Sequence, residues 1–459
     1  MVVLRSFRVA NHRSIRDEQE LLLLPAYDKH RAVVPVAAIF GANASGKSNL
    51  LNALRFVQTA VRSSYAEWEP GGGIPRQPFR LDPGRADEPS VYVVDLNLAD
   101  VRHVYGLVID DDQVREEWLF VYPRGRRRTL FQRDENGIRL GATLPDYRSR
   151  TETLAGLTRK NALFLSTAAH ANQQEVLPVY DWFRDGLSVP SDGKSNSWVR
   201  TLARRLQKSG AEKQAVVELA RLADLGISDV AVIEEGGKLQ RLAEGISDLL
   251  RSREKPADTF EEATLEWEDT FRETFNRLTD PAAVATESDH FGVETYVTLR
   301  FEQGRHGQSL GLGDQSEGTK AWMRLLVGVL EALDKGSLLT IDEIDTSLHP
   351  RLTARLIELF QDTRANSRSA QLVFATHDAS LLGTSFGREV LTRDQIWFVE
   401  KDADGATALF PLTDFHPRKE ENTERRYLGG SYGAVPAVFS DSLVDGYLAA
   451  RREPLDDSA

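Results

Sequence analysis

Apolar positions along the chain follow two spacings, and the change between them divides the sequence into segments. From residue 1 to about 170, short runs of alternating apolar and polar residues are separated by turns, a pattern that predicts β-strands. Residues 91–122 predict an antiparallel meander with turns at 99–100 and 110–112. One helix is expected in this segment, from about residue 46 to 62.

From about residue 175 to 285, apolar residues recur three and four positions apart, which indicates amphipathic helices. The runs SWVRTLARRLQKSG, EKQAVVELARLADLG and FEEATLEWEDTFRETFNRL show this spacing. From about residue 290, strands and helices alternate, which is typical of a parallel sheet covered by helices. We therefore expect an α/β protein with an N-terminal part at 1–174, a helical insertion at 175–289 and a C-terminal part at 290–459.

The most specific motif is GANASGKS at 41–48, which follows the apolar run AVVPVAAIF and precedes the expected helix. It matches Gly-x-x-x-x-Gly-Lys-Ser in the strand–loop–helix context that forms a phosphate-binding loop. Lys47 would reach the β- and γ-phosphates of ATP, and Ser48 would place its hydroxyl on Mg²⁺. The residues predicted to bind the nucleotide here are Gly41, Asn43, Gly46, Lys47, Ser48 and Asn49.

A second apolar strand, in SLLTIDEID at 337–345, ends in two carboxylates. Such a strand delivers Asp342 and Glu343 to the C-terminal edge of a sheet, where ligands bind. Asp342 would hold Mg²⁺, usually through water, and Glu343 would polarise the attacking water as general base. The alternative is a solvated acidic turn, but the phosphate-binding loop in the same chain favours the catalytic interpretation.

A third apolar strand, in QLVFATHDASLL at 371–382, ends in His377. One helical pattern separates it from Glu343, so His377 is expected on a neighbouring strand end beside the γ-phosphate, as a catalytic residue. A histidine in this position can also be a structural or surface residue, and the order of the motifs favours the γ-phosphate contact.

The stretch GLGDQSEGTKAW at 311–322 is small and polar, and Ser316 is suited to cap the helix that follows. However, the order of phosphate-binding loop, long insertion, Ser-Glu-Gly, acidic strand and histidine resembles the ATP-binding-cassette (ABC) ATPases. Their signature loop, Leu-Ser-Gly-Gly-Gln, opens a helix that faces the γ-phosphate of ATP held by the other subunit. The resemblance implies that Ser316 and Gly318 are signature residues, whereas Glu317 and Thr319 depart from the pattern. Glu317 would repel the triphosphate unless it turns to solvent or to Lys320.

The run EIDTSLHP at 343–350 extends the resemblance, because Asp345 matches the D-loop aspartate at the ABC dimer interface. The resemblance implies an ABC-ATPase head, made of an N-terminal mixed or antiparallel β lobe and a parallel P-loop sheet, with the helical insertion. It also implies a homo-oligomer joined by ATP between two subunits. The glutamine of the family's Q-loop is not placed, and Gln77 and Gln132 are both candidates.

Within this superfamily the chain resembles the group of the SMC, RecF, RecN and OLD proteins, and most of all the bacterial "AAA family ATPase" proteins of the fifteenth AAA group. The residues that carry this are 40–54, 315–322, 391–402 and 425–436. Proteins of this shape, such as the PARIS ATPase, often belong to anti-phage systems with a separately encoded toxin or nuclease, so the resemblance implies a sensor or scaffold that regulates such an effector. The alternatives are a RecF-like repair ATPase that binds duplex DNA and a self-contained effector enzyme. Only 82 residues (378–459) follow His377, so we expect no nuclease here.

Composition adds limits. The chain has no cysteine and a net charge of −12, which suits a reducing cytosol and disfavours non-specific binding of nucleic acid by the whole surface. No run of about 18 apolar residues and no signal peptide is visible, so we expect a cytoplasmic protein without a membrane span. The run YPRGRRRTLFQRD at 122–134 has five arginines. Its segment from Arg124 to Arg128 could contact nucleic acid, or be a solvated hairpin.

Overall fold

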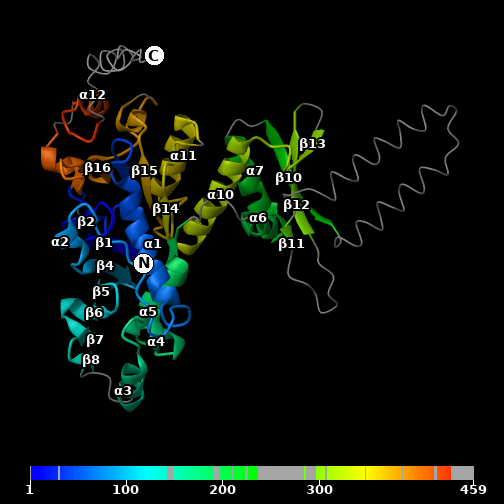
Figure 1. Ribbon diagram of the computed structural model, residues 1–459. Coiled ribbons are helices and arrows are strands. Elements are labelled where there is room, and N and C mark those ends of the chain that lie inside the picture. Colours follow the sequence, from blue (N-terminus) through cyan, green and yellow to red (C-terminus); the bar gives the residue numbers. More distant parts are fainter. Residues whose placement is uncertain are drawn as a thin grey trace, which may run out of the picture. The chain divides into compact units, whose positions relative to one another are not determined.

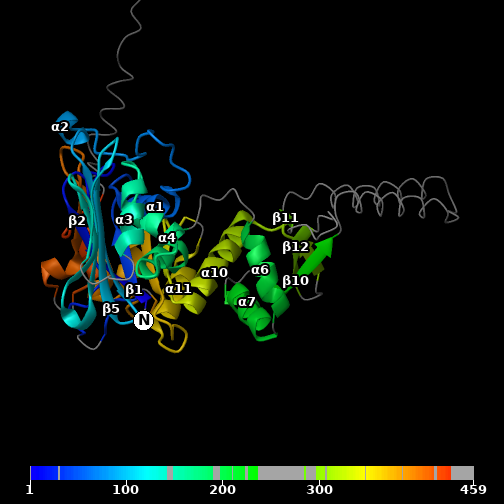
Figure 2. The same cartoon turned by 90° about the horizontal axis from the view of Figure 1, so that it is seen from below.

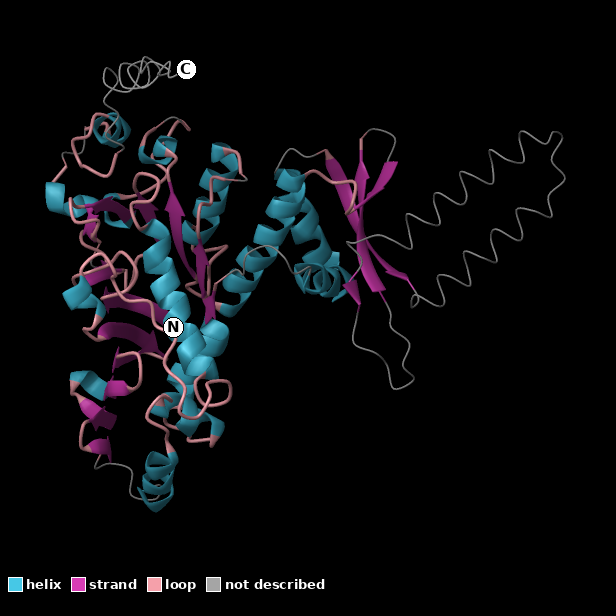
Figure 3. Ribbon diagram, viewed as in Figure 1, coloured by secondary structure: helices cyan, strands magenta, loops and turns pink. Residues whose placement is uncertain are grey.

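The computed structural model divides into two compact units, one of Met1–Arg184 with Leu372–Ala459 and one of Asp185–Gln371. Figure 1 labels the elements of both units along the chain, and Figure 3 separates helices from strands. The structure describes residues 2–28, 31–141, 148–189, 197–208, 210–222, 226–235, 284–285, 296–304, 308–346, 348–384, 386–417 and 421–435. Among these residues, no helix combines the length and the apolar character needed to cross a membrane.

The first unit contains a seven-stranded antiparallel sheet of order β2-β1-β4-β5-β6-β7-β8. Its strands are β1 Val2–Ala10, β2 Gln19–Leu22, β4 Ser90–Leu98, β5 Val101–Ile109, β6 Val114–Tyr122, β7 Arg128–Asp134 and β8 Gly137–Leu140. Ala99 and Asp100 both have positive φ, as a tight two-residue hairpin requires. The Asp110 side chain accepts hydrogen bonds from the N–H groups of Asp112 and Gln113 in the next turn. The predicted meander and its turns are therefore confirmed.

One face of this sheet is buried against α1, Lys47–Ser63, and α4, Phe164–His170. Glu117 on β6 is fully buried there, and its carboxylate accepts hydrogen bonds from the N–H groups of Phe164 and Leu165 at 2.6 and 2.9 Å. Burial raises the pKa of Glu117, and the nearby Arg133 guanidinium opposes that shift. A carboxylate at the first turn of α4 interacts favourably with the positive end of the helix dipole, and its hydrogen bonds anchor this helix on the sheet. Figure 2 shows both helices on the same side of the strands.

A second set of strands in this unit is parallel, with β3 between β15 and β16, and β17 added antiparallel. The strands are β3 Val36–Phe40, β15 Gln371–Thr376, β16 Ile396–Lys401 and β17 Thr407–Pro411. β3 and β15 are buried at every position, as expected for parallel strands covered on both faces. The smaller elements of the unit are α2 Pro83–Ala86, η1 Pro123–Gly125, α3 Arg148–Leu157, α5 Leu177–Asp181, η4 Ala379–Leu382, η5 Arg393–Gln395, η6 Leu412–Phe415 and α12 Thr423–Leu428, with η3 Trp182–Gly186 at its boundary.

The second unit contains an antiparallel sheet in which β12 pairs with β10, β11 and β13, and a parallel pair of β14 with β9. Its strands are β9 Leu187–Ser188, β10 Ile227–Glu235, β11 Val284–Ala285, β12 Tyr296–Gln303, β13 Gln308–Gly311 and β14 Leu338–Ile341. Its helices are α6 Ser197–Lys208, α7 Gly210–Leu222, α10 Glu317–Lys335 and α11 Pro350–Gln361. Helix α10 packs against both α6 and α7.

The structure confirms an α/β fold that joins an antiparallel β lobe to a parallel sheet carrying the GANASGKS loop. Inside the expected helical insertion, α6 and α7 coincide with two of the helical runs, but residues 227–235 form strand β10. Ile227, Val230 and Val232 are β-branched and favour a strand that pairs with β12. The third helical run, at 260–278, lies outside the described residues. The expected boundaries at 174/175 and 289/290 stay predictions.

Candidate functional site

The GANASGKS loop connects β3 to α1 and is closed in by backbone and side chains of β16 and β17. Gly46 has φ +112°, and a Cβ there would lie 2.1 Å from the Thr407 Oγ1. A Cβ on Gly41 would lie 2.4 Å from the carbonyl oxygen of Val399. Only glycine fits at these two positions, because the first needs a left-handed backbone and both lack space for a side chain.

Lys47, at the first position of α1, is 6% exposed and folds back over the loop. Its Nζ donates to the carbonyl oxygens of Gly41 and Ala42 at 2.7 and 3.0 Å. No side chain caps the N-terminus of α1 and no acidic residue lies in its first turn. The helix therefore presents backbone N–H groups and a positive dipole end beside a lysine, an arrangement that fits a phosphate group. Ser48 and Asn43 are exposed on the same loop.

A turn that follows β1 holds a second group of polar residues against this loop. Ser14 Oγ accepts from Asn49 Nδ2 at 2.6 Å and lies 2.6 Å from Thr407 Oγ1, which donates to the Ser45 carbonyl at 2.9 Å. Arg13 Nε donates to the Gln77 side chain, and Arg13 Nη1 donates to Asn49 Oδ1 at 3.4 Å. Asn49, predicted to bind nucleotide, thus connects this turn to the first turn of α1.

The backbone of this turn is strained and firmly anchored. Asn11 and Arg13 both have φ +51°, a conformation that non-glycine residues rarely adopt. Buried His12 lies 2.8 Å from the Tyr92 hydroxyl and 3.0 Å from Asn52 Oδ1, and burial lowers its pKa to about 4. The neutral ring therefore donates from Nε2 to Asn52 and accepts from Tyr92. The turn at 11–14 matches no motif, and its sequence indicates only a polar turn.

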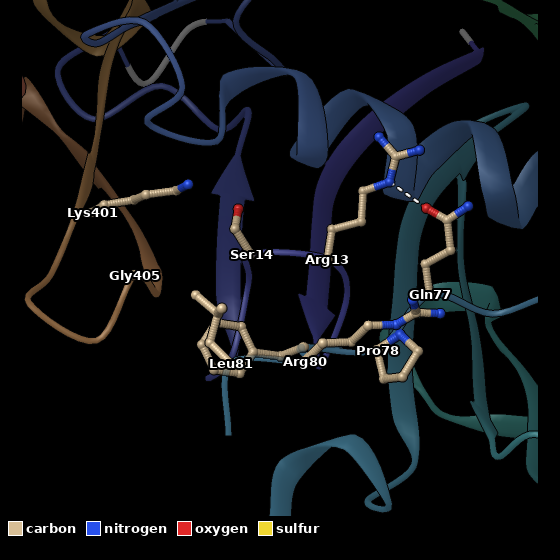
Figure 4. Close-up of a pocket in the computed structure, with 9 residues that line it drawn as sticks. Arg13, Ser14, Gln77, Pro78, Arg80, Leu81, Lys401 and Gly405 are labelled. Atoms are coloured by element: carbon tan, nitrogen blue, oxygen red, sulfur yellow. Dashed lines mark hydrogen bonds between the residues drawn. The ribbon is translucent and has the colours of Figure 1, made fainter. Parts of the chain in front are cut away.

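Figure 4 shows the pocket of about 430 Å³ into which this turn projects. It is lined by Arg13, Ser14, Gln77, Pro78, Phe79, Arg80, Leu81, Lys401 and Gly405. Three cationic side chains and the apolar surface of Pro78 and Leu81 suit a flat heterocycle attached to an anionic group. Gln77, one of the two Q-loop candidates, lies in this pocket, whereas Gln132 is on β7.

His377 lies at the edge of the parallel strands from which the phosphate-binding loop also leaves. In the β15–β3 pair, Thr376 is directly opposite Phe40, so His377 and Gly41 are the next residues of two adjacent strands. The His377 side chain is exposed. The parallel pairing of β15 with β3 therefore places His377 at the same sheet edge as the start of the loop.

In the second unit, the acidic residues follow β14 as predicted. Asp342 and Glu343 are both exposed, and Glu343 has φ +47°. The Thr346 N–H and hydroxyl donate to the Glu343 carbonyl and to its Oε2 at 3.0 and 3.3 Å. Glu343 is thus held in a left-handed conformation, and half-buried Asp345 lies within the same turn. His349 Nδ1 then accepts from the Arg351 N–H and caps α11.

Ser316 is the N-cap of α10, and its Oγ accepts from the Thr319 N–H at 3.1 Å. Ser316 and Gly318 are exposed, and a Cβ on Gly318 would meet nothing closer than Ser316 Oγ at 3.7 Å. The preceding loop is tied to the antiparallel sheet of this unit, because Gln303 Nε2 donates to Gln315 Oε1 at 3.0 Å. The helix itself is fixed by buried Trp322, whose Nε1 donates to the Leu219 carbonyl on α7 at 3.1 Å.

The side chain of Glu317 is 89% exposed and pairs with Lys320, whose Nζ lies 3.0 Å from Glu317 Oε1. Lys320 Nζ also donates to the Gly313 carbonyl at 3.4 Å. The carboxylate is therefore directed along the first turn of α10 to a cation of its own helix. This is one of the two orientations in which Glu317 is not expected to repel a triphosphate.

A phosphate-binding loop at the carboxyl edge of parallel strands defines a P-loop nucleotide-binding protein. The profile of the family described as "AAA domain, putative AbiEii toxin, Type IV TA system" matches residues 36–383, well over half of the chain. The chain therefore belongs to this family of P-loop ATPase domains. No curated protein matches the chain.

Several solved SMC head domains are similar to the chain. One, described as the SmcHead bound to the C-winged helix domain of ScpA, is 14% identical, with 90% of this chain and 99% of that chain covered and a TM-score of 0.36. The SMC head domain from Thermotoga maritima is 13% identical, with 89% and 98% covered and a TM-score of 0.36. TM-scores this low transfer no residue role to this chain.

Proposed function

We propose that the protein binds ATP with Mg²⁺ and hydrolyses it in composite sites between two copies of the chain. The observation that carries the proposal is the loop of Gly41 to Ser48, in which the Lys47 ammonium lies over the loop beside the uncapped start of α1, and the glycines allow close packing on β16 and β17. Such a loop has backbone donors and one buried ammonium for phosphate oxygens, and no side chain that would exclude them.

The nucleotide's two ends would be held by different parts of the first unit. Lys47 would exchange its carbonyl partners for the β- and γ-phosphates, and Ser48 would contribute a hydroxyl ligand for Mg²⁺. Arg13 and the pocket beside it would take the base and ribose, supported by the cationic and apolar lining. His377, which follows the strand adjacent to β3, would contact the γ-phosphate. When bound, Mg²⁺ would offset charge that develops on the phosphates.

The residues of the second unit would complete the reaction. Asp342 would hold Mg²⁺ through water, and Glu343 would accept a proton from the attacking water as general base. The left-handed backbone of Glu343 supports such a role, because strain in an exposed turn recurs at functional positions. We assign Asp342 and Glu343 to the same nucleotide as Lys47 from the order of these motifs in the chain.

Ser316, Gly318 and Asp345 would come from the second copy of the chain. The start of α10 is exposed at Ser316 and Gly318, and a Cβ would fit at Gly318, so none of the described residues of one chain requires a glycine there. A close approach of this surface to a triphosphate would require a glycine at position 318, because a side chain there would occupy the space of the phosphates. Association would then depend on the γ-phosphate, and hydrolysis would become a conformational signal.

We further propose that this signal restrains or releases a separately encoded toxin or nuclease in anti-phage defence. The family description, with its putative toxin of a type IV toxin–antitoxin system, supports membership of a two-gene system. The motif resemblance to the ATPases of the fifteenth AAA group and of PARIS supports the same role. A RecF-like clamp is the alternative, and it requires tight, ATP-dependent binding of duplex DNA by the isolated chain.

Glu343→Gln tests the composite site. The amide keeps the size of the side chain but cannot accept the proton of water, so ATP should stay bound and unhydrolysed. We expect hydrolysis to fall by at least about a hundredfold, within the usual contribution of a general base. Light scattering should show a larger species in ATP and not in ADP.

The matched control is Glu358→Gln, an exchange of the same kind on α11, which should leave both readings unchanged. Normal hydrolysis by Glu343→Gln would show that the base is misassigned. Trapped ATP on a species that remains a monomer would refute the composite site while leaving the general base intact.

A further inference from the structure

Strand β6 carries three aromatic side chains on the face of the antiparallel sheet opposite to α1 and α4. Glu117 and Leu119 point into the core, whereas Trp118, Phe120 and Tyr122 alternate with them and are half-buried. Alternate residues of an antiparallel strand lie about 6.8 Å apart on one face. The rings therefore form a row along β6 on the side of the sheet opposite to α1 and α4.

The ring of Trp118 lies flat against the neighbouring strand. Trp118 is directly opposite Gly106 on β5, and a Cβ on Gly106 would lie 2.1 Å from Trp118 Cζ2. Only a glycine lets the indole rest on the β5 backbone. One face of the ring is thus used in packing, and the other face accounts for the partial exposure of this side chain.

Guanidinium groups lie over the other two rings. Arg102 Cζ is 4.8 Å from the centre of the Tyr122 ring, and Arg127 Cζ is 5.0 Å from the centre of the Phe120 ring. These are cation–π distances, and they place two guanidinium groups over two of the three aromatic rings. Arg102 also pairs with Asp95 at 2.8 Å, and this carboxylate is shared with Arg5 at 3.4 Å.

The arginine end of β6 is strongly cationic in a chain whose net charge is −12. Arg124, Arg126 and Arg127 are exposed in the β6–β7 turn, and residues 123–133 contain no acidic residue. The exposed acid of β6 itself, Glu116, lies at the opposite end of the strand. Cations next to aromatic rings, with no acidic residue within 123–133, complement a polyanion that also carries flat bases.

We propose that this surface binds single-stranded nucleic acid. It is named the β6 face and consists of Arg102, Trp118, Phe120, Tyr122, Arg124, Arg126 and Arg127. Unpaired bases would stack on the row of rings, and the arginines would pair with backbone phosphates. A duplex keeps its bases stacked inside and could use only the arginines, so the aromatic row favours a single strand. The proposal does not depend on the ATP site, because none of these residues belongs to it.

The test is fluorescence anisotropy of the full chain with a labelled 20-nucleotide oligothymidine and with a duplex of equal length. The single strand should bind more tightly, and its affinity should fall steeply as salt rises from 50 to 200 mM. Arg126→Glu with Arg127→Glu should weaken binding at least about tenfold, since two phosphate contacts become repulsive. Tyr122→Ala should weaken it by about five- to a hundredfold, the usual loss of one stacked base.

The matched control reverses two exposed arginines elsewhere, Arg351→Glu with Arg355→Glu on α11, and should bind the oligonucleotide as the unchanged chain does. Circular dichroism checks that each variant is folded, and exposure of Arg126 and Arg127 makes their variants the decisive ones. If the double variant Arg126→Glu with Arg127→Glu binds the oligonucleotide as tightly as the unchanged chain does, the proposal is overturned. Tighter binding of the duplex also overturns it, as does binding of an acidic protein where no single strand binds.

Discussion

The phosphate-binding loop at 41–48 and the loop at 311–318 before α10 both lead into a helix with small residues, yet their surroundings differ. Around Gly46 the loop is packed on all sides, with Thr407 where a side chain would be. Around Gly318 the loop is open, and the nearest atom to an added Cβ is an ordinary contact away. The first helix has no side-chain cap, whereas the second is capped by Ser316.

This difference separates what one chain needs for folding from what it offers to another molecule. The glycines of the first loop are required by the chain's own packing, and the loop is complete as a phosphate cradle. None of the described neighbours of Gly318 requires a glycine at this position. The exposed start of α10 is held in place by hydrogen bonds from Gln303 to Gln315 and from Trp322 to the Leu219 carbonyl. A rigid support beneath an open surface is what a site completed by a second chain requires.

The largest expected effect comes from exchanging each glycine for alanine. Gly46→Ala should abolish ATP binding and lower the free energy of unfolding by about 1–3 kcal/mol, because its backbone is left-handed and the methyl group meets Thr407. Gly318→Ala should bind ATP normally and keep or slightly raise stability, since alanine favours a helix. Its hydrolysis should nevertheless fall. Isothermal titration with ATP, thermal unfolding and phosphate release measure the three quantities.

Equal losses of ATP binding in the two variants would contradict the proposed difference between the two loops. The loop at 311–318 would then act on the ATP of the chain that carries it. Normal hydrolysis by Gly318→Ala would show that nothing approaches this position closely.

Exchanges of Ser316 have the next largest effect and separate capping from catalysis. Ser316→Asn keeps an N-cap acceptor, so its unfolding free energy should match that of the parent, whereas Ser316→Arg should lose about 1 kcal/mol with the cap. If Ser316 faces a phosphate of a second chain, both variants should bind ATP normally and hydrolyse it poorly, with Ser316→Arg inactive. Urea unfolding and steady-state hydrolysis distinguish the two roles. A fully active Ser316→Asn would leave the serine only as a cap.

Local sequence patterns were sufficient for the parts of the candidate site that depend on few residues. The loop from Gly41 to Ser48 needs glycines at fixed positions, and the strand before His377 needs an unbroken apolar run, so both were readable. The structure adds that these two strands are neighbours, with Thr376 opposite Phe40.

Other parts depend on contacts between distant residues and carry no local pattern. Arg13 reaches the loop because buried His12 and strained Asn11 hold its turn, and its partners Gln77 and Asn49 are remote in sequence. Strand β10 was read as part of a helical insertion, although its β-branched residues could have indicated a strand. The helical spacing on both sides outweighed that signal.

The smallest expected effect concerns Glu317, the residue by which the two loops differ most in charge. It is exposed, and its partner among the described residues is Lys320, so Glu317→Gln should change the free energy of unfolding by less than about 0.5 kcal/mol. If α10 meets the triphosphate of a second chain, removing this carboxylate lowers repulsion, and the KM for ATP should fall by about two- to fivefold. The effect should shrink at high salt, as surface electrostatics does. Lys320→Gln is the matched control and should raise KM, because it leaves Glu317 without its cation. A KM that rises in Glu317→Gln would mean that the carboxylate assists the site, and a KM that is unchanged in both would place this turn away from the nucleotide.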